Sequence, residues 1–286
     1  MLAELRRALR ALREQNISRL ALGTFVDRFG DWLVLITLLV GAAEGSIDNA
    51  SVIAWAFALW VAPRMLISVL YKDVGDRLGA RAWPALAIAK AAILMLTFIA
   101  IFARLLPGTL EFILGLSAAM GFAAAVGNEV RAAAVRRTTP VQQLGQTTSA
   151  VAFIDRAAVF VAGLTAGVVG FLAPIAISLG IAGIAFVIAA VFIYLNSPAR
   201  YEERLQTGPP PDAWPDPRDY ARQTVVWLVT AFTSGAVGAA LLIAAFTFFG
   251  YRALCYGECD VGTLESDGAF VVAAAGLGML LAPLPM

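Results

Sequence analysis

Several ionisable side chains lie inside long apolar stretches of this sequence, where they could carry protons or pair with one another. They are Asp27, Arg28, Asp31, Arg64, Lys90, Glu129, Arg131, Asp155 and Arg156. An ionisable group in the middle of a membrane costs at least about 2.5 kcal/mol to insert, so each is a candidate functional residue. Histidine is absent, which excludes imidazole relays and histidine-ligated metal or haem. Any proton carrier must therefore be a carboxylate.

Asp31 is the first candidate for such a carrier. It lies one helical turn deeper than Asp27 and stands next to Trp32. Glu129 is the second candidate, and Asp155 is also considered. The alternative is that all these charges form structural ion pairs that fix the register of the helices.

Two acid–base pairs are adjacent in the sequence, Asp27–Arg28 and Asp155–Arg156. Neighbouring residues point about 100° apart on a helix, so each group needs a partner on another helix. Cross-pairing among the first, fourth and fifth spans would neutralise them. The candidate charge partners are Asp27, Arg28, Arg131 and Arg156.

The composition indicates a membrane protein, in which these charged residues lie on transmembrane helices. Of the residues, 60% are hydrophobic and 14% are charged, and the mean hydropathy is +0.80. Apolar blocks of this length cross a bilayer, where backbone groups must bond within a helix. Eight spans are predicted, at residues 18–43, 52–71, 84–106, 110–132, 149–173, 175–195, 224–251 and 268–285.

Arginine and lysine are concentrated in alternate connections, which indicates the orientation. The segments 72–81, 136–137 and 200–222 are basic, like the N-terminus, whereas the connections between them are nearly free of bases. We therefore expect both termini in the cytoplasm of a multi-pass protein of the plasma or inner membrane. Arg64 and Lys90 are expected to extend toward the cytoplasmic surface.

The chain divides into four segments. Residues 1–16 have leucines on one face and arginines on much of the rest, which predicts an amphipathic helix at the membrane surface; a soluble helix that packs on a partner protein is the alternative. Residues 17–198 form a six-span unit, 199–223 a proline-rich cytoplasmic linker, and 224–286 a two-helix membrane hairpin.

Cys255 and Cys259 lie in the connection between the last two spans, which is expected on the outer face. A disulfide is favoured in an oxidising compartment. Free thiols are one alternative. A metal site with Glu258 and Asp260 is another, but two thiols without histidine make a poor site, so no metal is expected.

Three stretches of the six-span unit carry a resemblance to a known family. "FGDWLVLITLLV" includes Asp31, "GDRLGAR" begins at Gly75, and "GNEVRAAAVRRTTPVQQLG" includes Glu129. Together they resemble the major facilitator superfamily, and more narrowly its macrolide-efflux-like drug-export branch, over about residues 17–198. The resemblance implies an all-α membrane protein that has the six-helix half of a facilitator fold plus two extra C-terminal transmembrane helices.

The second stretch resembles the family signature between the second and third helices, Gly-x-x-x-Asp-Arg-x-Gly-Arg-Arg. The matching residues are Asp76, Arg77, Gly79 and Arg81. Lys72 replaces the opening glycine and Ala80 replaces one arginine. The resemblance implies a loop that locks the cytoplasmic gate. Gly79 can adopt backbone angles closed to other residues, and Asp76 can cap a following helical turn and attract Arg77 or Arg81.

The third stretch resembles the junction of the fourth and fifth helices. The matching residues are Asn128, Arg131, Pro140 and Leu144. Glu129 stands where a proline is usual.

Carriers of this family have two six-helix halves that move about a central site. We therefore expect a half-size transporter for export of small molecules or drugs, with protons as a candidate coupling ion. It would need a second copy in a homodimer, or another membrane protein in a hetero-complex. The alternative is a transport-inactive, facilitator-like structural or assembly subunit of a larger membrane complex. The expected partners are thus the lipid bilayer and this second copy or other membrane protein. No enzyme activity, cofactor or nucleic-acid binding is expected.

Overall fold

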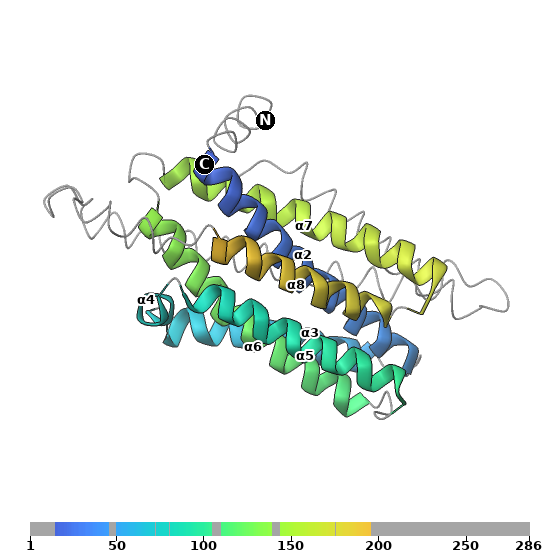
Figure 1. Cartoon of the computed structure of the whole chain (residues 1–286). Coiled ribbons are helices and arrows are strands. Elements are labelled where there is room, and N and C mark those ends of the chain that lie inside the picture. Colours follow the sequence, from blue (N-terminus) through green and yellow to red (C-terminus); the bar gives the residue numbers. More distant parts are fainter. Residues whose placement is uncertain are drawn as a thin grey trace, which may run out of the picture.

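The computed structural model describes residues 15–45, 50–71, 73–79, 81–104, 110–138, 144–174 and 176–195. These residues form helices joined by short connections and include no strand (Figure 1). The helices are α2 (Gln15–Gly45), α3 (Ala50–Leu70), α4 (Val74–Leu78), α5 (Ala82–Phe102), α6 (Leu110–Thr138), α7 (Leu144–Leu172) and α8 (Ile177–Leu195). Each of the six spans expected before residue 196 overlaps one long helix. The expected linker, C-terminal hairpin and cysteine pair lie outside the described residues, as does nearly all of the N-terminal helix.

Four of the described helical segments are long and apolar enough to cross a membrane. They are Ala82–Phe102, Glu111–Arg136, Ala150–Gly170 and Ile177–Leu195, and α3 contains a shorter apolar stretch, Val52–Ser68. Large apolar side chains on α5 and α8 are more than half exposed, among them Leu96 and Ile184. Exposed apolar faces of this kind suit lipid rather than water. The chain is a multi-pass membrane protein.

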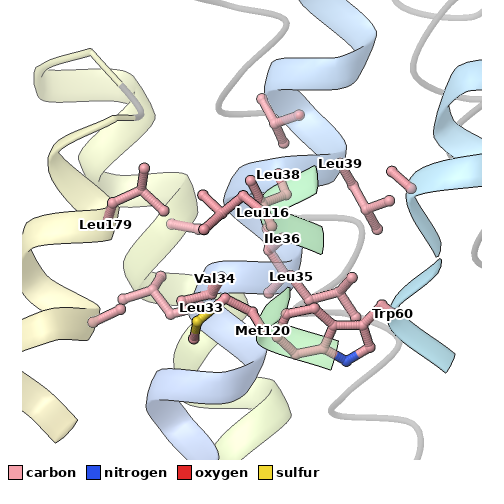
Figure 2. Close-up of a cluster of buried hydrophobic side chains, with 14 of the residues drawn as sticks. Leu33, Val34, Leu35, Ile36, Leu38, Leu39, Trp60, Leu116, Met120 and Leu179 are labelled. Atoms are coloured by element: carbon pink, nitrogen blue, oxygen red, sulfur yellow. The ribbon is translucent and has the colours of Figure 1, made fainter. Parts of the chain in front are cut away.

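Helix α2 lies at the centre of the described bundle. Every residue from Leu33 to Val40 is buried, so this stretch is covered on all sides. The covering helices include α7 and α8 on one side and α3 and α6 on another. Figure 2 shows leucines of α2 packed with Trp60, Leu116, Met120 and Leu179. The charged N-terminal half of α2 is thereby held at a fixed rotation against its neighbours.

Two glycines allow close approach of helix backbones. A Cβ atom on Gly121 would lie 2.7 Å from Cα of Trp60, where α6 crosses α3. A Cβ atom on Gly75 would lie 2.2 Å from the carbonyl oxygen of Glu129, where α4 packs on α6. Real Cβ contacts of this length do not occur, so a side chain at either position would force the helices apart.

Candidate functional site

Lys90 of α5 lies at the centre of a buried charge cluster. Its Nζ is 2.5 Å from Oδ1 of Asp27 and 3.0 Å from Oδ1 of Asp31, both on α2. The residue is only 1% exposed, so the expectation that Lys90 extends toward the membrane surface is wrong. Two carboxylates of α2 offset part of the cost of removing the ammonium group from water.

Aromatic side chains complete the environment of this lysine. Nζ of Lys90 lies 4.1 Å from the ring centroid of Phe186 on α8, which is a cation–π contact. Gly30 lets that ring approach α2, since an added Cβ would lie 2.8 Å from it. Nε1 of Trp83 donates a hydrogen bond of 3.3 Å to Oδ2 of Asp27. No pattern in the sequence indicated Trp83 or Phe186. Lys90 itself could have been suspected, because it stands in an apolar stretch and another apolar stretch carries Asp27 and Asp31 as possible partners.

A second group of charges is centred on Asp155 of α7. Its Oδ1 lies 2.9 Å from Nε of Arg28 and 3.4 Å from Nη1 of Arg131. Nη2 of Arg131 also donates a 3.3 Å hydrogen bond to Oδ1 of Asn128. Arg28 and Arg131 are buried, whereas the Asp155 side chain is 33% exposed. These ion pairs connect α2, α6 and α7.

Arg28 joins the two groups into one cluster. Its Nη1 lies 3.4 Å from Oδ2 of Asp31, while its Nε contacts Asp155. Arg64 of α3 acts electrostatically on the same cluster, including Asp31, Asp155 and Arg131. The Nε of Arg64 is buried and has no hydrogen-bond partner in the described part of the chain. Arg156 is half-buried on α7.

Glu129, the second candidate carrier, belongs to a different region. It is half-buried on α6, and the charges that act on it are those of Arg136 and Asp76. The structure therefore places Asp31 and Asp155 in one cluster and separates Glu129 from it.

The charged loop near Asp76 includes a short helix at one end of the bundle (Figure 1). Asp76 lies inside α4 and its Oδ2 is 3.4 Å from Nη2 of Arg136 on α6. Asp73 occupies the N-cap position of α4, and Arg81 occupies that of α5. Gly79 has a φ of +71°, which a residue with a Cβ rarely adopts. Arg77 and Arg81 are exposed.

Metal binding has no support among the residues that the structure describes, where no group of three or more metal-ligating side chains occurs. The chemistry of the cluster is that of ion pairing, proton binding or recognition of a charged solute.

A family model described as Major Facilitator Superfamily matches residues 20–285. The match extends beyond residue 198 and so includes the expected linker and the last two expected spans. Comparisons with curated proteins and with solved structures gave no match.

Proposed function

Because this chain belongs to the major facilitator superfamily and is a facilitator-type transmembrane transporter, we propose that it exports small molecules, including drugs, in exchange for protons. Asp31 is the proposed proton carrier. The observation that carries this proposal is that both cationic partners of Asp31 contact a second carboxylate.

Protonation of Asp31 leaves neither of its partners without a carboxylate. Lys90 retains Asp27 at 2.5 Å, and Arg28 retains Asp155 at 2.9 Å. An unpaired buried cation is strongly unfavourable, so shared partners lower the cost of neutralising this one group. Protonation of Asp155 differs, because Asp155 is the one ion-pair partner of Arg131 among the described residues.

The test is drug-dependent proton flux in proteoliposomes that contain the purified protein. We expect Asp31→Asn to reduce this flux to the background of empty liposomes, because asparagine cannot bind and release the proton. Asp73→Asn, which changes an exposed aspartate near α4 in the same way, should retain the flux. Unchanged flux in folded Asp31→Asn protein would show that Asp31 is not the carrier.

We further propose that the Asp76–Arg81 turn faces the cytoplasm and contributes to a gate. The ion pair of Asp76 with Arg136 supports this role, because both side chains are nearly half exposed and exposed pairs contribute only about 0–1 kcal/mol. Such a pair can break and re-form as the carrier changes conformation.

The orientation can be tested by labelling. In a Cys255→Ser/Cys259→Ser background, Arg77→Cys should react with a membrane-impermeant maleimide in inside-out vesicles and not in intact cells. Arg77 is exposed at the end of α4, so the side of the membrane decides the result. Labelling in intact cells would reverse the proposed orientation.

A structural or assembly subunit is the second candidate function. It is favoured by the ion pairing of both Asp31 and Asp155, which suits charges that fix helix register. Gentle purification distinguishes the two functions. A homodimer or hetero-complex that shows proton flux supports the carrier, whereas one copy in a stable hetero-complex without flux supports the subunit.

A further inference from the structure

The charges of the buried cluster around Arg28 do not balance. Its carboxylates are Asp27, Asp31 and Asp155, and its cations are Arg28, Arg64, Lys90 and Arg131. Among the residues that the structure describes, four cations face three carboxylates. A surplus cation inside an apolar helical bundle is unfavourable unless an anionic group completes its environment.

Arg64 carries this surplus. The other three cations each form at least one ion pair shorter than 3.5 Å, whereas Arg64 forms none with the described residues. Its Nε is buried without a hydrogen-bond partner there. It also lies close enough to Arg28 and Arg131 for their like charges to act on it. These like charges repel the guanidinium group of Arg64, so an anionic group is needed to stabilise its charge.

The nearby acceptors already contact other arginines. Oδ1 of Asp155 contacts both Arg28 and Arg131, and Oδ1 of Asn128 accepts from Arg131. Guanidinium N–H donors therefore outnumber the carboxylate and amide acceptors that they contact. Arg64 and Asp155 are both partly exposed, so the described helices do not fully cover this end of the cluster.

We propose that Arg64, with Arg131 beside it, binds the oxyanion group of the transported compound, which is then an organic anion. A planar guanidinium group matches a carboxylate or phosphate through two parallel hydrogen bonds. This inference rests on the proposed transport function and specifies its substrate class. Pro63 directly precedes Arg64 inside α3. Proline inside a helix usually kinks it, so we expect a kink in α3 beside Arg64.

The test is binding of anions to the purified full-length protein. Calorimetric titrations use benzoate, its neutral counterpart benzamide, and inorganic phosphate, at equal ionic strength. We expect benzoate to bind at least about tenfold more tightly than benzamide, because a charge-assisted hydrogen bond contributes about that factor or more. Binding of phosphate but not benzoate assigns the site to phosphorylated solutes. Failure of both anions to bind overturns the proposal.

Variants of Arg64 then locate the site. Arg64→Gln should weaken anion binding at least about tenfold, and Arg64→Lys should restore part of it, because the charge returns without the planar fork. Arg104→Gln, which changes an exposed arginine beyond the end of α5, should bind as the unmodified protein does. Equal affinity in Arg64→Gln overturns the assignment. If Arg64→Gln does not fold, the benzoate–benzamide comparison on the unmodified protein still decides the proposal.

Failure of this inference is distinguishable from failure of the proposed function. Drug-dependent proton flux with a cationic drug, unaffected by benzoate and by Arg64→Gln, would support transport and overturn the anion site. Benzoate binding that depends on Arg64, without any flux, would support the site and overturn the export function.

Discussion

Replacing Lys90 with methionine is expected to lower the free energy of unfolding by about 3–5 kcal/mol, the usual effect of removing one partner from a buried ion pair. Methionine has a similar length, so the change removes the charge and leaves most of the packing. Among its contacts with the described residues, Asp27 would lose its ion pair and keep the hydrogen bond from Trp83. Asp31 would keep Arg28, 3.4 Å away. The measurement is titration of the detergent-solubilised protein with SDS, followed by tryptophan fluorescence.

Two further variants separate charge from packing. Lys90→Met combined with Asp27→Asn should recover at least half of the lost stability, since the carboxylate without a cation is then neutral. Arg136→Gln breaks the exposed pair with Asp76, whose side chains are 49% and 47% exposed, and should change stability by only about 0–1 kcal/mol. If Lys90→Met were as mild as Arg136→Gln, the buried cluster would not contribute to stability as the geometry indicates.

Gly121→Ala is expected to destabilise the packing of α3 on α6 by about 1–3 kcal/mol, the usual range for a core that receives an additional methyl group. The new Cβ would lie 2.7 Å from both Cα and the carbonyl oxygen of Trp60. These are backbone atoms, so no side chain can rotate away, and the two helices must separate. Trp60 itself is 1% exposed, so its fluorescence should report the shift in the same SDS titration.

Gly115→Ala is the matched control on the same helix. A Cβ atom at Gly115 would have no neighbour within 4 Å, so this change should be neutral or stabilise α6 by up to about 1 kcal/mol through helix propensity. Equal stability of Gly121→Ala and Gly115→Ala would mean that α3 and α6 are not packed as closely as described.

The positions of the helices could be predicted from the sequence, because the length and hydropathy of an apolar block are local properties. The block that begins near residue 84 became α5, and the block that ends at residue 195 became α8. The need for φ > 0 at Gly79 was also visible, since the residue stands in a short turn between two apolar blocks. The depth of Asp31 followed from its place in the first block.

The pairing of the charges was decided by the tertiary structure. Which carboxylate Lys90 contacts depends on the rotation of α5 about its axis and on which helices pack against α5. A local stretch of sequence determines neither. The same holds for Arg136, which pairs with Asp76 across 60 residues, a partner that no local stretch of sequence indicated. Hydropathy fixed where each charge lies along its helix. Only helix packing, set by contacts such as Gly121 against Trp60 and Gly75 against Glu129, fixed which charge it faces.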